Sequence, residues 1–425
     1  MRTLFFLMFA FGSAAWSAQW PSWRGPTYDG ISPDTQAPLR WSRTENVRWI
    51  FRLREPGNST PIVWSNTVFL TQNLGKQRAL IAVDRRNGRP RWTTAEDGLD
   101  DEVTQAANPY CAPSPVTDGE RVITWFGSVG LFAYDFSGKK LWETKFGRQR
   151  HQFGYGSSPV LHGDVVYLNF GPGIQEFVVA VDKKTGKELW RTTGPHAGKD
   201  DTYGTWSTPF LTHVDGRPQL LVALRDYFAG LDPTTGTEIW HVSGLGLQAK
   251  ASPISDGKTA LISGDLKGAE VAVRLGHTGD VTESHRIWRE FPPRRRVGTG
   301  IIRDGYVYGA QANGLLDCVN LETGDIVWAE RQSGSGANSA VWSSPVLVGD
   351  RLYIHNQGGD TVILSASPQY KQIAVNSIGE PGNASPVIVD GELFLRTHAA
   401  LWCFREGSPA PAQTSGAGTA GARNR

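Results

Sequence analysis

One repeated pattern constrains this chain more than any other feature of its sequence. A Ser-Pro or Thr-Pro pair opens a segment that reaches a Trp roughly thirty residues later. Within each segment, short alternating apolar stretches are separated by Gly-bearing turns, which predicts four β-strands. With one degenerate Thr-Gly opening, the starts divide residues 45–405 into eight units of about 45 residues. These starts are Thr60, Ser114, Ser158, Thr208, Ser252, Thr299, Ser344 and Ser385. Eight four-stranded units predict an all-β, eight-bladed β-propeller.

One predicted strand, residues 46–51, lies before the first complete unit. The eighth unit stops at Cys403-Phe404 after three predicted strands, whereas residues 46–51 read as a fourth strand with no preceding three. We therefore expect the N-terminal strand to complete blade eight. Closure of the ring in this way leaves no open sheet edge.

The ends of the units carry a second pattern, Gly-x-x-x-Trp, which indicates aromatic docking between blades. An indole between two sheets buries a large area and can donate its N–H to a backbone carbonyl, so we interpret these Trp residues as structural. Cys318 and Cys403 occupy a position that takes Ala or Gly in other units, and we interpret them as small core residues. The seventh unit has neither Gly nor Trp over residues 368–373. The predicted docking residues are Trp49, Trp92, Trp142, Trp190, Trp240, Trp288 and Trp328.

The two ends of the chain fall outside the repeat. Residues 1–17 have the apolar run and small residues of a secretory signal peptide, and no Cys near the cleavage site could carry a lipid. Residues 18–44 form an arm that we expect to pack on the ring through Trp20 and Trp23. Residues 406–425 lack bulky side chains and are predicted to be disordered. These features predict a periplasmic or secreted protein with no transmembrane span after cleavage.

The clearest repeat, Ala180-Val181-Asp182-Lys183-Lys184-Thr185-Gly186-Lys187-Glu188-Leu189-Trp190, resembles the docking repeat of the pyrroloquinoline-quinone (PQQ) type propellers. Two branches of that family bear on function. Quinoprotein alcohol and glucose dehydrogenases hold PQQ and Ca²⁺ on the propeller axis, whereas BamB-like propellers act as non-catalytic interaction platforms. The chain lacks the adjacent cysteine pair of many such dehydrogenases, because Cys111 stands between Tyr110 and Ala112. It also lacks the lipid-acceptor Cys of the BamB-like lipoprotein.

The repeat predicts which residues face the mouth of the central funnel. In a propeller the loop that enters the first strand and the loop after the second strand open on the same side, and polar and aromatic residues there suit a small polar ligand or a peptide. A polar loop surface without a ligand is the alternative. The candidates from the entering loops are Asn58, Tyr155, Trp206, Lys250, Arg296, Trp342 and Asn383, and those from the second-strand ends are Asn169, Arg225, Asp265, His355, Asn356 and Arg396.

One motif suggests a metal site. Glu55-Pro56-Gly57-Asn58 recurs as Glu380-Pro381-Gly382-Asn383 before two blades that become neighbours when the ring closes. Two Glu and two Asn oxygens would suit Ca²⁺. A shared turn shaped by Pro and Gly is the alternative. The speculative calcium ligands are Glu55, Asn58, Glu380 and Asn383.

These observations favour a non-catalytic binding platform in the cell envelope, with an envelope protein or a small polar ligand as its partner. The 43 basic and 41 acidic side chains give a net charge of +2 and no broad field for nucleic acid. No haem-type, phosphate-binding or nucleophile motif is present in the sequence. The alternative is a PQQ- and calcium-dependent dehydrogenase that oxidises alcohols or sugars at the funnel. We expect a monomer.

Overall fold

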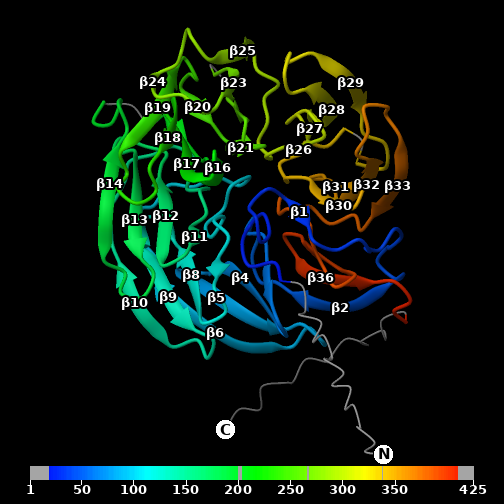
Figure 1. Ribbon diagram of the computed structural model, residues 1–425. Helices are drawn as coiled ribbons and strands as arrows, with labels where there is room; N and C mark the ends of the chain where they lie inside the picture. The colour runs from blue at the N-terminus through cyan, green and yellow to red at the C-terminus, as the bar shows by residue number, and fades with distance from the viewer. Residues whose placement is uncertain (1–18, 200–202, 266–267, 337, 410–425) are drawn as a thin grey trace, which may run out of the picture.

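The computed structural model describes residues 19–199, 203–265, 268–336 and 338–409, which form an eight-bladed β-propeller. Each blade is a sheet of four strands, and the blades surround one central axis (Figure 1). A single 3-10 turn, η1 (Gly127–Val129), is the only helical element of the described residues. None of the described elements is a helix of the length and apolarity that crossing a membrane requires. The predicted fold is confirmed, while the predicted signal peptide and the tail from residue 410 lie outside the described residues.

The first four blades follow the chain in order. Blade 1 consists of β3 (Ile62–Trp64), β4 (Thr67–Leu74), β5 (Gln77–Asp84) and β6 (Pro90–Asp97). Blade 2 consists of β7 (Val116–Thr117), β8 (Arg121–Trp125), β9 (Leu131–Asp135) and β10 (Lys140–Thr144). Blade 3 consists of β11 (Val160–His162), β12 (Val165–Phe170), β13 (Phe177–Asp182) and β14 (Glu188–Thr193). Blade 4 consists of β16 (Phe210–Val214), β17 (Arg217–Leu224), β18 (Tyr227–Leu231) and β19 (Glu238–Ser243).

The last four blades return to the N-terminus. Blade 5 consists of β21 (Ile254–Ser255), β22 (Thr259–Ser263), β23 (Glu270–Arg274) and β25 (Arg286–Glu290). Blade 6 consists of β26 (Ile301–Arg303), β27 (Tyr306–Ala310), β28 (Leu315–Asn320) and β29 (Ile326–Arg331). Blade 7 consists of β30 (Val346–Val348), β31 (Arg351–His355), β32 (Asp360–Ser365) and β33 (Gln372–Ser377). Blade 8 consists of β34 (Val387–Val389), β35 (Glu392–Arg396), β36 (Ala400–Arg405) and β2 (Val47–Arg52).

Four short strands add to this frame: β1 (Ile31–Ser32) joins blade 7, β24 (Gly279–Asp280) joins blade 4, and β15 (Gly204–Thr205) pairs with β20 (Gln248–Ala249).

The ring closes where the sequence predicts. β2 pairs antiparallel with β36, and Trp49 lies opposite Cys403. The N-terminal strand therefore completes blade 8.

A ring of hydrogen bonds explains the repeated Ser or Thr at the start of each blade. In every blade the backbone N–H of this residue donates to the hydroxyl oxygen of its counterpart in the next blade, over 2.8 to 3.1 Å. The bonds run from Thr60 through Ser114, Ser158, Thr208, Ser252, Thr299, Ser344 and Ser385 back to Thr60. Thr299 takes part although Gly300 follows it, so the hydroxyl is what the ring requires.

The Gly-x-x-x-Trp pattern joins neighbouring blades. The Trp142 indole donates to the Lys183 carbonyl of blade 3 over 2.9 Å. Gly186 of blade 3 has a φ of +73°, and a Cβ there would lie 2.6 Å from the Trp142 ring. Glycine is thus required both by the left-handed turn and by the packed indole. Equivalent indole-to-carbonyl bonds join Trp49 to Arg85, Trp92 to Phe136, Trp190 to Pro233, Trp288 to Leu321 and Trp328 to Ser367.

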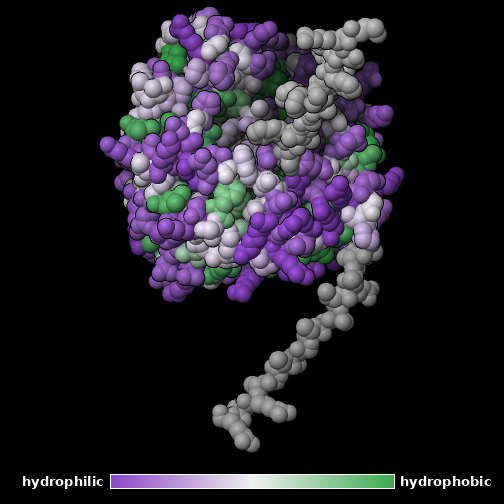
Figure 2. Space-filling model, turned by 60° about the horizontal axis from the view of Figure 1, so that its bottom comes forward, coloured by the Kyte–Doolittle hydropathy of each residue, from purple (hydrophilic) through white to green (hydrophobic). Residues whose placement is uncertain are grey.

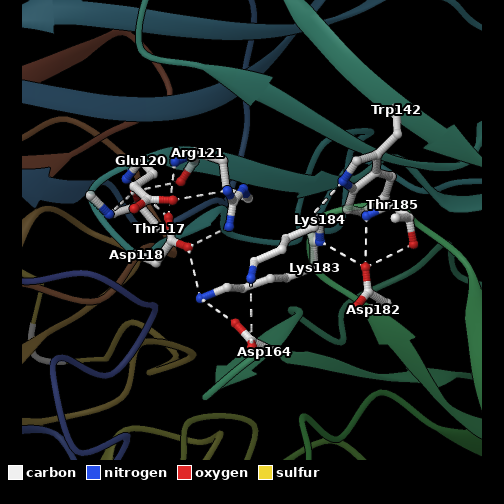
Figure 3. A network of polar contacts seen from close by, with 11 residues as sticks. Thr117, Asp118, Glu120, Arg121, Trp142, Asp164, Asp182, Lys183, Lys184 and Thr185 are labelled. Atoms are coloured by element: carbon white, nitrogen blue, oxygen red, sulfur yellow. Dashed lines mark hydrogen bonds and ion pairs between the residues drawn. The ribbon is translucent and has the colours of Figure 1, made fainter.

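Polar side chains reinforce the contact between blades 2 and 3 (Figure 3). The Lys183 ammonium lies 3.2 Å from Asp118 of blade 2 and 3.2 Å from Asp164 of blade 3. Arg121 pairs with Asp118 over 2.8 Å. The residue whose carbonyl receives Trp142 therefore also ties together the turns of both blades.

The contact between blades 4 and 5 departs from this pattern. The Trp240 indole donates to Gln219 Oε1 of its own blade over 2.9 Å instead of to the next blade. The reason is the insertion in blade 5, because β24 pairs parallel with β19 and places Gly279 beside Trp240. Strand pairing replaces indole docking here.

The contact between blades 7 and 8 is completed by the arm. Ala374 lies opposite Ile363, at the register where Trp190 lies opposite Ala180. The space that a docking Trp fills in other blades is taken by Trp41, which is buried and packs on Tyr353 and Phe404. An aromatic residue from outside the repeat thus supplies the missing contact of blade 7.

The arm also crosses the central channel, where Figure 1 shows the blue N-terminal segment. Trp20 exchanges backbone hydrogen bonds with Val63 of blade 1, and Pro21 accepts one from Thr117 of blade 2. The Tyr28 hydroxyl bonds to the Leu161 backbone of blade 3, and β1 pairs parallel with β30 of blade 7. The arm therefore holds inner strands from across the ring.

Candidate functional site

A central pocket, here called the funnel, opens where the loops enter the inner strands. It has a cavity volume of about 140 Å³. Its walls come from the starts of all eight blades and from the arm, because the hydroxyl ring brings these loops together. The lining residues are Trp23, Asn58, Thr60, Gln105, Asn108, Ala112, Ser114, Phe153, Gly156, Ser158, Trp206, Thr208, Lys250, Val297, Trp342, Asn383 and Ser385.

The arm closes the inner end of this funnel. Trp23 lines the pocket, while its neighbours hold the arm across the channel. The Arg24 guanidinium donates to the carbonyls of Thr299 and Gly300, each over 2.8 Å. The arm also bonds to Val63, Thr117 and Leu161, at the ends of the inner strands away from the entering loops. It therefore crosses the channel at that end, which makes the funnel blind with Trp23 as its floor.

The structure brings part of the predicted ligand site together. Five predicted residues line the funnel: Asn58, Trp206, Lys250, Trp342 and Asn383. Sequence reasoning missed Trp23, Gln105, Asn108 and Phe153, which come from the arm and from the long loops before blades 2 and 3. These segments do not repeat, so blade alignment carries no signal for them.

The other predicted ligand residues lie outside the funnel lining. Asn169 donates to Thr205 and Ser207 of the loop entering blade 4, and Arg396 donates to Ser59 and Thr71 of blade 1. The entering loop of the next blade thus covers the end of each second strand. The residues placed in this way, or in other buried contacts, are Asn169, Arg225, Asp265, His355, Asn356, Arg396, Tyr155 and Arg296.

Burial shifts the pKa values of two of these residues outside the funnel lining. Burial lowers the pKa of His355 to about 4 and that of Arg396 to about 10. Arg296 is instead paired with Glu270 and, over 2.7 Å, with Asp317. Tyr155 packs on Trp125 and bonds to Ser128 over 2.8 Å. These side chains support the loops and do not face the funnel.

Lys250 supplies the cation of the funnel lining. Its ammonium pairs with the buried carboxylate of Asp265, which Arg295 also contacts over 3.2 Å. Burial acts to raise the pKa of Asp265, but the bond to Lys250 and the pairing with Arg295 hold it below the usual value. The carboxylate is therefore ionised at neutral pH and compensates Lys250 locally.

The repeated Glu-Pro-Gly-Asn loops do not converge four oxygens on one point. Glu55 accepts hydrogen bonds from Asn73 and Gly75 of its own blade, and Glu380 accepts bonds from Trp402 and Thr397. Among the four residues, only Asn58 and Asn383 contact each other, where Asn383 Nδ2 donates to Asn58 Oδ1 over 3.4 Å. Across the described residues, no group of three or more His, Cys, Asp or Glu is arranged to hold a metal ion. The glycines explain the motif, because a Cβ at Gly57 would collide with Arg396.

The funnel lining also fits PQQ with calcium poorly. PQQ carries three carboxylates, and a calcium ion beside it requires several oxygen ligands, usually including a carboxylate. The described lining holds one cation, already paired, and no Asp or Glu. We derive no chemistry through this cofactor.

Comparisons with known proteins place the chain in a family. The family profile described as "Outer membrane protein assembly factor BamB" matches residues 40–168, 137–296 and 225–410. BamB of Burkholderia pseudomallei is 29% identical over 222 residues, 51% of this chain and 48% of that protein. BamB of Salmonella typhimurium is 23% identical over 330 residues, 65% of this chain and 80% of that protein. The match to the Burkholderia relative thus spans about half of its length.

Two solved structures share the fold at 13% identity. BamB of Moraxella catarrhalis superimposes with a TM-score of 0.60 and covers 84% of this chain and 96% of its own. A quinohemoprotein alcohol dehydrogenase of Pseudomonas putida superimposes with a TM-score of 0.64 and covers 95% of this chain and 82% of its own. The profile match extends over almost all of the described residues, and the chain therefore belongs to the PQQ-type propeller family described as outer membrane protein assembly factor BamB.

Proposed function

We propose that this protein is an exported, non-catalytic propeller that binds a partner in the cell envelope through the mouth of its funnel. The observation that supports this most is the blind pocket formed by the entering loops and floored by Trp23. The family match to an outer-membrane assembly factor supports the envelope location.

The surface chemistry agrees with a localised site. Figure 2 shows a face on which hydrophilic residues prevail and apolar residues form separate small groups. The exposed large apolar residues include Leu141, Leu189, Ile326 and Ile373, each on the outermost strand of a different blade. A broad apolar interface would need such residues to be contiguous. The funnel mouth instead combines aromatic, amide and hydroxyl groups in one concave place.

Photo-crosslinking in the native host tests the proposal. A crosslinkable residue at Gln105, on the mouth, should give a discrete adduct in the envelope fraction. The matched control at Asp350, an exposed turn residue on the opposite side of blade 7, should give none. Equal adducts from both positions, or a protein absent from the envelope fraction, would contradict the proposal.

The dehydrogenase alternative has its own test. Titration of the purified protein with PQQ and Ca²⁺ should leave its thermal stability unchanged and support no dye reduction with alcohols or sugars. Stoichiometric PQQ binding with turnover would replace the platform by an oxidoreductase. The poor fit of the described lining is the reason to expect the first result.

A further inference from the structure

The charge of the funnel limits what it can bind. Lys250 is the charged side chain of the described lining, and its partner Asp265 is 1% exposed. A carboxylate or phosphate ligand would have to compete with this internal pair, and a cationic ligand would find no acid in the lining. Burial of an uncompensated charge is costly, so the lining favours an uncharged ligand.

Aromatic groups supply the apolar part of the lining. Trp206 donates its indole N–H to Gly154 O over 2.8 Å, and this bond fixes the orientation of the indole. The centroid of the Phe153 ring lies 5.9 Å from that of the Trp206 ring. The indole N–H groups of Trp23 and Trp342 have no acceptor among the described residues. Both side chains are only partly buried, so they can offer a ring face and a donor to the same ligand.

Amide side chains supply fixed acceptors. Asn108 donates its Nδ2 to the carbonyls of Phe153 and Tyr155, which leaves Oδ1 as an acceptor. Asn58 donates its Nδ2 to Ala107 O over 2.9 Å and keeps a second lone pair on Oδ1 beside Asn383. The exposed side chain of Gln105 adds both a donor and an acceptor. Hydroxyl groups, which donate and accept, match this mixture best.

We propose that the funnel binds the end of a neutral carbohydrate, with a sugar ring against the Trp faces and its hydroxyls on the amides. A sugar ring has apolar C–H faces and a polar edge, and it carries no charge. The floor at Trp23 closes the channel, so a terminal sugar unit is held and a chain cannot thread through. This inference rests on the proposed function, since it names the ligand of the same mouth.

A glycan array followed by titration tests the inference. The purified, fluorescently labelled protein is applied to an array of neutral and acidic glycans, and hits are titrated by intrinsic Trp fluorescence. Neutral glycans should bind saturably, and Trp342→Ala should weaken binding about tenfold or more. Trp64→Phe, at the turn that ends the inner strand of blade 1, is the matched control and should bind like the wild type.

Three results would overturn the inference: no neutral glycan binds, only acidic glycans bind, or Trp342→Ala binds as tightly as the wild type. Melting curves verify that each variant is folded. If Trp342→Ala does not fold, Ala112→Trp fills the funnel and should abolish binding instead. If no glycan binds while crosslinks from Gln105 persist, the ligand class is wrong and the envelope platform stands. Loss of both would remove the proposed function as well.

Discussion

Two contacts between blades fill the same space with different parts of the chain: the contact between blades 2 and 3 and the contact between blades 7 and 8. In the first, Trp142 comes from the outer strand of the repeat and packs on Gly186. In the second, the outer strand offers only Ala374, and Trp41 arrives from the arm to pack on Tyr353. In both contacts an aromatic group occupies the same space between the blades, although different segments of the chain supply it.

The arm is consequently part of the folded ring. Trp20 and Trp41 are both buried, and Trp23 between them floors the funnel. The same segment therefore completes the contact between blades 7 and 8 and shapes the pocket.

The largest expected loss of stability follows from removal of the indole at either contact, Trp41 or Trp142. Trp41→Ala should destabilise the protein by about 4 kcal/mol, and Trp142→Ala by about 3 kcal/mol, because both lose a buried indole. Trp41 is 3% exposed against 8% for Trp142, and its loss also frees the arm. Denaturant unfolding of the two variants measures the difference. A Trp41→Ala cost below 1 kcal/mol would mean that the arm is not part of the fold.

A rebuilt contact sharpens the comparison. In the regular blades a small residue faces the docking Trp, as Ala180 faces Trp190. The triple variant Trp41→Ala, Ala374→Trp, Ile363→Ala restores that arrangement in blade 7 and should regain about 2 kcal/mol, roughly half of the loss. The control is the double variant Trp41→Ala, Ile363→Ala. If the triple variant melts no higher than the double, the two contacts are not interchangeable.

Two buried histidines predict a similar acid sensitivity near each contact. Burial lowers the pKa of His151, in the loop between blades 2 and 3, and of His355, in blade 7, to about 4. In the unfolded chain these histidines take up protons near pH 6.5. Their contribution to the free energy of unfolding is therefore fully present above that pH and is lost as the pH drops toward 4. For His355 the loss from pH 7.5 to 5 is about 2 kcal/mol. His355→Gln should flatten the pH dependence of unfolding by that amount, and an unchanged slope would contradict this.

The smallest effect concerns the ion pairs of Figure 3, which reinforce the regular contact. Lys183→Met removes the links to Asp118 and Asp164 but leaves the Lys183 carbonyl for Trp142. We expect a loss of about 1 kcal/mol that shrinks in high salt. A salt-independent loss would indicate a packing effect instead of an electrostatic one.

The sequence predicts the blades because their signals are local and repeat. The Ser or Thr at each start forms the hydroxyl ring. The position of Asn58, Trp206 and Lys250 just before these starts predicts that they lie together, and all three line one pocket. The repeat cannot reveal Trp23, Phe153 or the substitution of Trp41 for Ala374, since those depend on segments that occur once. It also cannot show that Asn169 and Arg396 are covered by the next blade, because that covering is tertiary.

The central claim is that the funnel itself is the binding site. Its most direct test measures the crosslink from Gln105 in two further variants of the same loop. Ala112→Trp fills the funnel, whereas Ala106→Trp places the same side chain at an exposed position outside the lining. The account predicts that Ala112→Trp abolishes the adduct and Ala106→Trp preserves it. An adduct that survives Ala112→Trp at wild-type yield would contradict the claim.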